Sequence, residues 1–233
     1  MRLRPFLPVL LFVSFIITSG IASAQLGIRA GFNAYNVISR NGNGNELYNG
    51  SRLNPGFHVG VTYDYLLSNN FYIQPAALFT TKGYRIKDIQ ESSSVESYLT
   101  PYYVEVPVNF LYAPKLGKGR LLLGAGPYIA YGIGGRGQYY GKTIEEGVVK
   151  RDDQSADLQF LNDTDDLKDG KWAYGKTWDY GVQVLEGYEF NERLSFQVNA
   201  QLGLANIHPD IKGVKSTNKI KNIGFGISVG YIF

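Results

Sequence analysis

The C-terminal stretch NIGFGISVGYIF (222–233) places an apolar or aromatic side chain at every odd position and Asn, Gly or Ser at the even positions from 222 to 230. The segment before it, RLSFQVNAQLGL (193–204), repeats this alternation with its apolar residues at even positions. Side chains of a β-strand point alternately to its two faces, so each segment predicts a strand with one apolar face and one small or polar face. The fold class that they indicate is all-β.

The same alternation, followed back through the chain, predicts eight strands. Each is long enough to cross a bilayer as a tilted strand, which takes about 9 to 11 residues. An even number of antiparallel strands can close into a ring. We therefore predict a single eight-stranded antiparallel transmembrane β-barrel whose strands cover residues 26–37, 55–67, 71–85, 101–113, 120–134, 176–190, 193–206 and 220–233.

Residues 1–24 have the three parts of a secretory signal peptide. They are two arginines at positions 2 and 4, an apolar core over residues 6–17, and Ala-Ser-Ala at 22–24. The core is too short to span a bilayer as a helix. We expect cleavage after Ala24, with residues 25–233 forming the barrel domain in the outer membrane. The mature chain would keep 21 basic and 20 acidic residues, and a net charge of +1 argues against nucleic-acid binding.

The composition excludes several other classes of protein. The chain has 28 glycines, 18 tyrosines, 13 phenylalanines and no cysteine. Without cysteine there is no disulfide framework, no thiolate zinc site and no thiol nucleophile. A mean hydropathy of −0.15 is too low for a polytopic helical membrane protein. With two histidines in the whole chain, we predict neither a metal site nor a cofactor.

The predicted connections alternate between short and long. Residues 68–70, 114–119 and 191–192 are tight turns, whereas 38–54, 86–100, 135–175 and 207–219 are long loops. Outer-membrane barrels have short turns at the periplasmic rim and long loops outside the cell. Both ends of the mature chain then lie at the periplasmic rim. A soluble barrel with an apolar core shares the alternation, but the signal peptide, the terminal Phe233 and the unequal loops favour the membrane.

Aromatic residues mark both rims of the predicted barrel. The strands that descend to the short turns end in aromatic pairs on one face: Tyr63 and Tyr65, Phe110 and Tyr112, Tyr188 and Phe190, Tyr231 and Phe233. At the other rim, the residues with outward parity include Phe57, Tyr102, Trp178 and Tyr180. Two aromatic belts are typical of a protein with two membrane interfaces. The terminal Phe233 also resembles the signal that the outer-membrane barrel assembly machinery reads, so we expect that machinery and outer-membrane lipid as partners.

Charged side chains gather at the inward parity. Both signs occur, and the interior of an eight-stranded barrel is narrow enough for side chains to fill it. We therefore predict an ion-paired polar network in the lumen; a path for protons or small ions is the alternative. The residues are Arg29, His58, Asp64, Lys82, Glu105, Arg120, Asp179, Glu189 and Arg193.

An enzymatic role has little support in the sequence. His58 is the one histidine on a predicted strand, and neither a G-x-S-x-G motif nor a paired-carboxylate spacing accompanies it. We predict no enzymatic activity. Some small outer-membrane barrels modify lipid with a Ser/His/acid group, which keeps a lipid-modifying enzyme as an alternative.

The predicted loop 135–175 is the largest segment outside the membrane. Residues 152–166 hold six aspartates and neither Lys nor Arg, but their spacing does not fit an EF-hand, so we expect a solvated, mobile acidic loop with at most incidental Ca²⁺ binding. Loops of this length are often functional. Three apolar residues within it, Leu158, Phe160 and Leu161, are candidates to anchor a partner.

Seven segments resemble the PorT-like family of small outer-membrane β-barrel proteins, over most of the mature chain. The resemblance implies an eight-stranded barrel and, in some members, a link to protein secretion; it supplies no catalytic residues. Two features depart from the pattern, the long 135–175 loop and Glu186 at a lipid-facing parity. The segments are LGIRAGFN (26–33), PGFHVGVTYDYLL (55–67), FYIQPAALFTTKGY (71–84), YYVEVPVNFLY (102–112), GAGPYIAYGIGGR (124–136), DYGVQVLEGYEF (179–190) and QLGLANI (201–207).

Three function classes follow from the sequence. The first is a non-enzymatic, monomeric barrel with a structural or interaction role that presents its loops outside the cell. The second is an accessory factor of protein secretion across the outer membrane, and the third is the lipid-modifying enzyme. Secretion-system or surface proteins are the partners expected for the first two.

Overall fold

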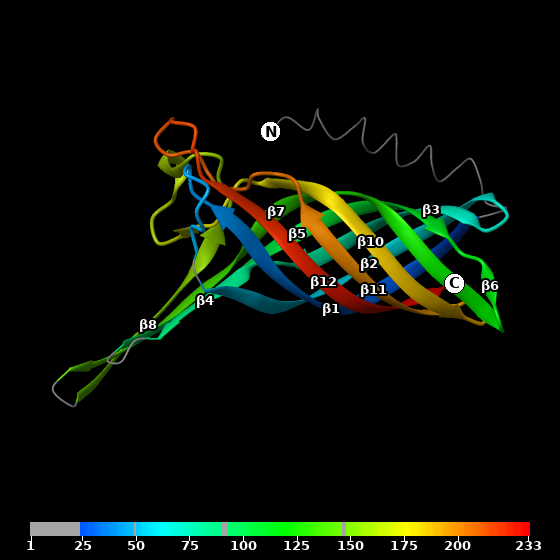
Figure 1. Ribbon diagram of the computed structural model, residues 1–233, viewed down its shortest axis with the longest axis horizontal. Coiled ribbons are helices and arrows are strands. Elements are labelled where there is room, and N and C mark those ends of the chain that lie inside the picture. The colour runs from blue at the N-terminus through cyan, green and yellow to red at the C-terminus, as the bar shows by residue number, and fades with distance from the viewer. Residues whose placement is uncertain (1–23, 49, 90–92, 146–147) are drawn as a thin grey trace.

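The computed structural model describes residues 24–233 except 49, 90–92 and 146–147 (Figure 1). The predicted signal peptide therefore lies outside the described residues, apart from Ala24. The described chain is almost entirely β, with a single 3-10 turn at Thr164–Asp166, which confirms the all-β class. No helix in the described part of the chain is long and apolar enough to cross a membrane.

Twelve strands make up one sheet, where the sequence predicted eight. Their bounds are β1 Ala24–Arg40, β2 Ser51–Ser68, β3 Phe71–Thr81, β4 Tyr84–Ile89, β5 Ser93–Tyr112, β6 Lys115–Leu116, β7 Gly119–Glu145, β8 Val148–Gln159, β9 Trp172–Ala173, β10 Trp178–Phe190, β11 Leu194–Gly203 and β12 Lys219–Ile232. The four without a predicted counterpart of their own are β4, β6, β8 and β9. They lie largely in segments that the sequence predicted as connections.

The pairing of the longer strands returns to its starting point. β1 pairs with β2, β2 with β3, β3 with β5, β5 with β7 and β7 with β10. β10 then pairs with β11, β11 with β12, and β12 with β1, all antiparallel. Figure 1 shows these strands inclined around a common axis. We call this closed set of strands the ring.

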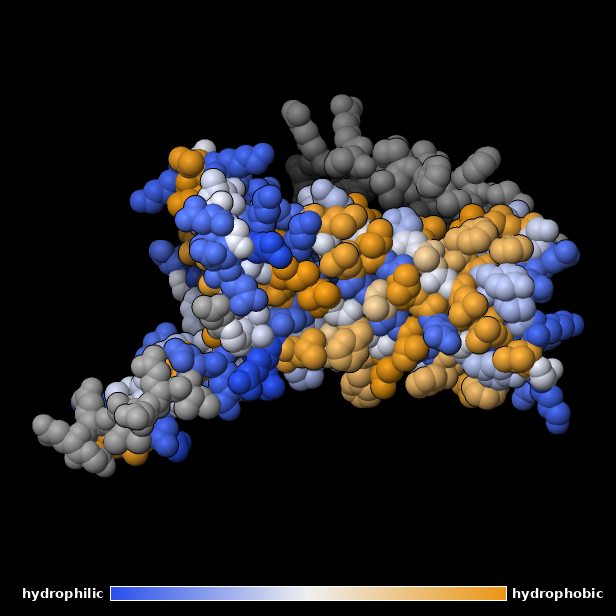
Figure 2. All heavy atoms as spheres, in the orientation of Figure 1, coloured by the Kyte–Doolittle hydropathy of each residue, from blue (hydrophilic) through white to orange (hydrophobic). Residues whose placement is uncertain are grey.

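The ring has its apolar side outside and its polar side inside. On β12, Phe225 is 53% exposed, whereas Asn222 and Ser228 are buried at 1% and 4%. β11 repeats this arrangement, with Phe196 and Val198 outside and Gln197 and Gln201 inside. In Figure 2 hydrophobic side chains cover the middle of the ring, and hydrophilic ones gather toward its two ends. A soluble barrel would bury the apolar face, so this arrangement excludes that alternative.

Two of the predicted long loops are largely strands. β5 begins at Ser93 rather than 101, β7 continues to Glu145 rather than ending at 134, and β8 returns beside it. Together β4, residues 93–100 of β5, residues 135–145 of β7 and β8 form an extension of the sheet, which we call the arm. Figure 1 shows it projecting beyond the long-loop end of the ring. Water reaches both faces of the arm, so its strands need no apolar alternation, which is why the sequence pattern missed them.

The remaining long segments fold over the same end of the ring, which we call the mouth. A cluster of buried side chains lies there, contributed by the strand ends and by residues 158–174 and 205–207; we call it the mouth cluster. Phe160 contacts the rings of Tyr103 and Tyr174 edge-on at 5.0 and 5.4 Å. The cluster closes the mouth with Val37, Tyr84, Tyr103, Tyr128, Ala130, Leu158, Tyr174, Ala205, Ile207 and Ile220.

Candidate functional site

A buried lysine joins two carboxylates below the mouth cluster. Lys82 lies between β3 and β4, where the chain bends through Gly83 (φ +112°); a Cβ at position 83 would lie 1.9 Å from the Leu99 carbonyl oxygen. Lys82 Nζ lies 2.7 Å from Glu105 Oε2 on β5 and 3.2 Å from Asp179 Oδ2 on β10. All three side chains are at most 1% exposed. One cation therefore neutralises charge from two distant strands.

Aromatic rings and an amide complete this site. The Lys82 ammonium lies 4.2 Å from the ring centre of Tyr128 and 5.3 Å from those of Tyr35 and Tyr103, distances at which a cation is attracted to a ring face. Asp179 Oδ2 accepts hydrogen bonds from Asn222 Nδ2 at 2.9 Å and from the Tyr128 hydroxyl at 3.3 Å. Asp179 Oδ2 is thus well partnered within the protein, as buried ions require, whereas Asp179 Oδ1 has no hydrogen-bond partner among the described residues.

Neutral polar side chains extend the network toward the middle of the ring. Gln201 Nε2 donates to Glu105 Oε1 at 2.7 Å and to Gln183 Oε1 at 2.8 Å, and Gln201 Oε1 accepts from the Tyr35 hydroxyl at 2.5 Å. Gln183 Nε2 donates onward to Asn109 Oδ1 at 2.7 Å. These bonds join four strands across the interior.

A second group lies in the middle of the ring. Arg29 Nη2 donates to Gln74 Oε1 at 2.6 Å, and Gln74 Nε2 donates to Asp64 Oδ1 at 2.7 Å. His58 is buried nearby and borders, with Arg29 and Gln201, a cavity of about 20 Å³. This volume has room for about one water molecule.

A third group lies near the short-turn end. Arg120 Nε and Nη2 donate to Glu189 Oε1 at 2.9 and 2.6 Å, and Nη1 donates to the Tyr72 hydroxyl. The guanidinium carbon also lies 5.1 Å from the centre of the Tyr72 ring. Polar side chains therefore fill the ring interior at three levels, and the Lys82 group joins strands from its opposite sides.

The structure places eight of the nine predicted lumen residues inside the ring. Arg193 is the exception: it is exposed at the turn between β10 and β11, where Asn191 and Glu192 have positive φ, and Nη1 lies 3.5 Å from the Tyr231 hydroxyl. For Arg193 the prediction is wrong, because the alternation was continued into the turn. The neutral partners Gln74, Gln183, Gln201 and Asn222 were missed, although their inward parity could have found them.

The loop residues predicted to anchor a partner lie within the molecule. Leu158 is 2% and Leu161 4% exposed, and Phe160 is half-buried against Tyr103 and Tyr174. Packing in the mouth cluster uses their apolar surface, so in this arrangement they are not available to a partner. The acidic segment also differs from the expected mobile loop: Asp152, Asp153 and Asp157 lie on β8.

Aromatic side chains line both ends of the outer surface. At the short-turn end, Tyr188 contacts Phe190 with ring centres 4.7 Å apart, and Tyr231 contacts Phe233 at 5.7 Å. Phe71, which the sequence analysis did not single out, packs between Phe110 and Tyr112 at 5.6 and 5.0 Å. At the mouth end, Tyr131 and Trp178 are 4.9 Å apart. The other members with outward exposure are Phe57, Tyr65, Tyr102 and Tyr180.

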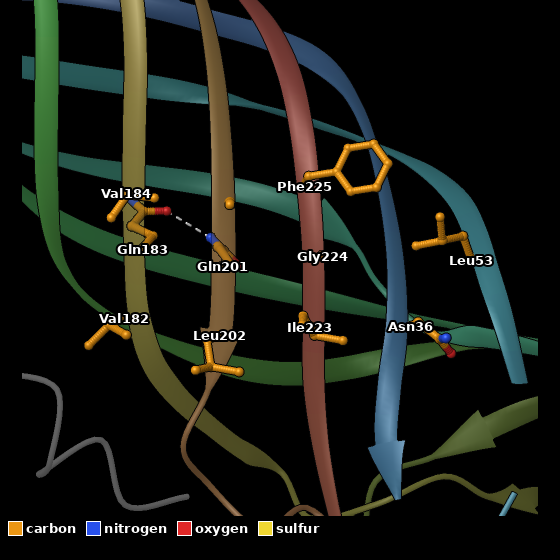
Figure 3. A pocket seen from close by; sticks show the side chains of 11 residues that line it. Asn36, Leu53, Val182, Gln183, Val184, Gln201, Leu202, Ile223, Gly224 and Phe225 are labelled. Carbon is orange, nitrogen blue, oxygen red and sulfur yellow. Dashed lines mark hydrogen bonds between the residues drawn. The ribbon is translucent and has the colours of Figure 1, made fainter.

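A groove of about 560 Å³ runs over the outer wall across β10, β11 and β12 (Figure 3). In the figure Val182 and Val184 border it from β10, Leu202 from β11 and Phe225 from β12. Beside it, Glu186 points outward between Leu123 and Val198. The groove's apolar lining suits lipid acyl chains.

Ion pairing also fixes the loops at the mouth. Lys176 Nζ lies 3.1 and 3.2 Å from the two carboxylate oxygens of Asp210, and the Ser216 N–H donates to Asp210 Oδ1 at 3.3 Å. These hydrogen bonds lower the pKa of Asp210 below its ordinary value of 3.8, and the bond from Lys176 has the larger effect. Among the described residues, no group of three or more His, Cys, Asp or Glu side chains is placed to hold a metal ion.

Residues 19–209 match the family model described as outer membrane protein beta-barrel domain. Similar solved structures include Ail, the attachment invasion locus protein of Yersinia pestis (12% identity, 91% of this chain and 99% of that chain, TM-score 0.37). OprG from Pseudomonas aeruginosa (14%, 91% and 96%, 0.35) and the outer membrane protease OmpT from Escherichia coli (14%, 91% and 97%, 0.40) are others. No curated protein matches the sequence. The family match covers most of the chain, so this protein belongs to the outer membrane protein beta-barrel domain family, and the outer membrane is its location.

Proposed function

We propose that the ring is an eight-stranded transmembrane barrel and that the protein acts through contacts made by the parts beyond the membrane, without enzymatic activity. The observation that carries this proposal is the filling of the interior at three levels, by the group around Lys82, which spans the ring, and by those around Arg29 and Arg120. Side chains that are hydrogen-bonded across a narrow barrel hold it closed to solutes and leave the outer parts to meet partners.

The arm is the part of the molecule best suited to such contacts. Its strands continue directly from the barrel wall, since β5 and β7 stay paired from Tyr112 opposite Leu123 to Ser93 opposite Thr143. A surface built on paired strands is held more rigidly than a structureless loop. We infer that the arm, rather than the buried Leu158 and Leu161, is the contact surface.

The proposal requires that the chain be exported and inserted into the outer membrane. We infer that the chain is cleaved after Ala24, because residues 1–24 hold the three parts of a signal peptide. Phe233 is exposed at the end of the chain, and its N–H donates to the Leu26 carbonyl, which joins the last residue to the first strand. We infer that the barrel assembly machinery recognises β12, whose outward side chains are apolar.

Deletion of the gene, complemented with the full chain or with a chain whose arm is shortened, tests this function. We expect the shortened chain to insert normally and to lose contacts at the cell surface, measured by crosslinking on intact cells. Loss of exported cargo in the deletion strain would favour the PorT-like secretion role instead. A change in lipid A acylation that depends on His58, seen by mass spectrometry, would favour a lipid-modifying enzyme.

A further inference from the structure

The arm has an outer and an inner face. Successive side chains of a strand point to opposite faces, so every second residue of β5 from Tyr102, on the lipid-facing wall, back to Ser94 lies on one side of the sheet. We call this side the outer face. The other side, the inner face, carries Tyr84 and Leu99, which pack in the mouth cluster. The outer face is therefore turned away from the mouth, toward the lipids that surround the ring.

Most basic side chains of the arm lie on its outer face, since directly opposed residues share one face of a sheet. Three acidic residues lie there too, and two of them are directly opposite a basic one: Asp157 faces Arg136, and Glu96 faces Lys87. The inner face holds Lys150, the sixth basic residue of the arm. Basic residues thus exceed acidic ones on the outer face. They are Arg85, Lys87, Arg136, Lys142 and Arg151.

Two of these basic residues face each other. Lys142 on β7 and Arg151 on β8 are directly opposed, and both are exposed. Like charges in this arrangement destabilise a strand pair. Within the described part of the chain neither forms an ion pair, although Asp153 lies two positions from Arg151 on the same face. On the other side of Lys142, Ser94 of β5 adds a hydroxyl. We call Ser94, Lys142 and Arg151 the basic row.

A phosphate group suits the basic row. Its oxygens accept hydrogen bonds from a hydroxyl, an ammonium and a guanidinium, and the guanidinium can donate two parallel bonds. A phosphate monoester carries a charge of about −1.5 to −2 at neutral pH, whereas a carboxylate carries one negative charge. The charge of the phosphate therefore balances two cations, and its binding would relieve their repulsion.

The position of the row indicates what carries this phosphate. Tyr102 belongs to the aromatic belt at the mouth end, which marks the outer membrane interface, and it pairs with Gly134. Lys142 lies eight positions beyond Gly134 on β7, about 26 Å along the strand at about 3.3 Å per residue. The row thus lies outside the lipid layer, on the side of the arm that faces the neighbouring lipids. Saccharide chains of outer-leaflet glycolipids, which carry phosphate groups, occupy this zone.

The outer face is hollowed at its membrane-proximal end. A pocket of about 460 Å³ is lined there by Tyr102, Tyr131, Asp157 and Lys171, among others. It lies where β7 changes its neighbour from β10, at Tyr131, to β8, at Arg136. Concave sites with aromatic walls and a few polar groups are typical of small-molecule binding. This lining suits the ring and the hydroxyl groups of a sugar, so the pocket can hold one saccharide unit close to the membrane.

We propose that the outer face of the arm binds the phosphorylated saccharide of an outer-leaflet glycolipid, with a phosphate group between Lys142 and Arg151. The inference rests on the proposed function, in which the arm is the contact surface, and it names the partner. The glycolipid molecules beside the barrel are held to the arm through their saccharides, while their acyl chains stay in the membrane.

Deacylated lipopolysaccharide, a water-soluble saccharide that keeps its phosphate groups, is the probe for this site. In calorimetric titration of the detergent-solubilised full chain, we expect Lys142→Gln and Arg151→Gln each to weaken binding up to about fivefold, and the double variant to weaken it at least about tenfold. Lys142→Arg keeps the charge and should bind as the wild type does. Lys118→Gln, an equal loss of charge at the exposed short-turn end, should also bind normally. A wild type that does not bind, or a double variant that binds unchanged, would overturn the proposal.

Two further probes separate the phosphate group from its carrier. The same saccharide after enzymatic removal of its phosphates should bind at least about tenfold more weakly than the untreated one, because the basic row then has no anion to hold. Inorganic phosphate should also bind more weakly, because it fills the row but not the pocket. Unchanged binding after dephosphorylation would show that the row holds no phosphate. Equal affinity for inorganic phosphate would show that the glycolipid is not the ligand.

The two proposals fail in different ways. If shortening the arm removes surface contacts on cells while the saccharide does not bind, the arm contacts a protein and the glycolipid site is wrong. If the saccharide binds through Lys142 and Arg151 while the shortened chain keeps every surface contact, the glycolipid site stands and the proposed function is wrong.

Discussion

Among single residues, Lys82 is the one whose replacement we expect to reduce the free energy of unfolding most. Its ammonium neutralises Glu105 and Asp179, and all three side chains are buried. Removal of one partner from a buried ionic group leaves uncompensated charge and costs about 3 to 5 kcal/mol. We expect Lys82→Met to lower the free energy of unfolding in lipid vesicles by about that amount, measured by urea titration.

A triple variant separates lost charge from lost packing in this test. Lys82→Met combined with Glu105→Gln and Asp179→Asn removes the charges together, so it should be more stable than Lys82→Met alone. Arg193→Met, at the exposed turn, should change little, because exposed pairs contribute about 0 to 1 kcal/mol. If the triple variant is the least stable of the three, the side chains contribute mainly through packing.

Glu186 is expected to lower the free-energy penalty of a cation placed beside it on the lipid-facing wall. Val198 on β11 lies directly opposite Glu186, whereas Val229 on β12 lies opposite Phe196 and Ala30. An arginine on the lipid face of a barrel costs about 2 to 4 kcal/mol near the midplane. We expect Val229→Arg to reduce folding yield in vesicles more than Val198→Arg, and Glu186→Gln to remove the difference. Equal yields for the two arginine variants would mean that Glu186 does not reach position 198.

The Lys176–Asp210 pair stabilises the mouth loops only while Asp210 is ionised. The pKa of Asp210 is lower in the folded chain than the ordinary 3.8, so its contribution to stability is complete above pH 3.8 and is lost as the pH falls through the folded value. We expect the hydrogen-exchange protection of residues 207–218, measured relative to the intrinsic exchange rate at each pH, to fall only below about pH 4. In Asp210→Asn these amides should already be less protected at neutral pH. Their protection should then not fall further between about pH 4 and the folded pKa of Asp210, because no carboxylate is left to be protonated. An identical acid profile in both proteins would assign the change to another group.

At the scale of elements, the arm is expected to be separable from the barrel. Gln138 and Ser155 are directly paired, so replacement of residues 139–154 by Asn-Gly closes the hairpin with a two-residue turn in the native register. We expect this chain to insert as the full chain does, measured by its recovery in outer-membrane fractions, because the mouth cluster and the lumen groups are unchanged. A chain that fails to insert would show that the arm is needed for assembly.

The sequence predicted the wall of the barrel better than its extension. Asn222 and Phe225 lie on the two faces of one strand, and these faces meet different environments. The residues therefore alternate between polar and apolar, and this alternation identifies the strand in the sequence. At Arg151 and Asp153 both faces of the arm meet water, so no alternation identifies the strand. The turn at Arg193 was misjudged because backbone φ at Asn191 and Glu192, rather than hydropathy, ends the strand there.

For the whole molecule, the sequence could predict that charges fill the lumen but not which of them meet. Lys82 and Asp179 are 97 positions apart, and their contact depends on how far each strand is displaced along its neighbour. The neutral Gln201 is as central to the network as any ion. Its role follows from its position between Glu105 and Gln183, which only the closed ring defines.

The Lys82 site makes closure of the sheet electrostatically favourable. Lys82 follows β3 and Glu105 lies on β5, whereas Asp179 and Asn222 come from β10 and β12, far along the chain. A sheet in which these two sets of strands have not met would hold Lys82 without its second carboxylate. Such an open sheet is therefore disfavoured relative to the closed ring.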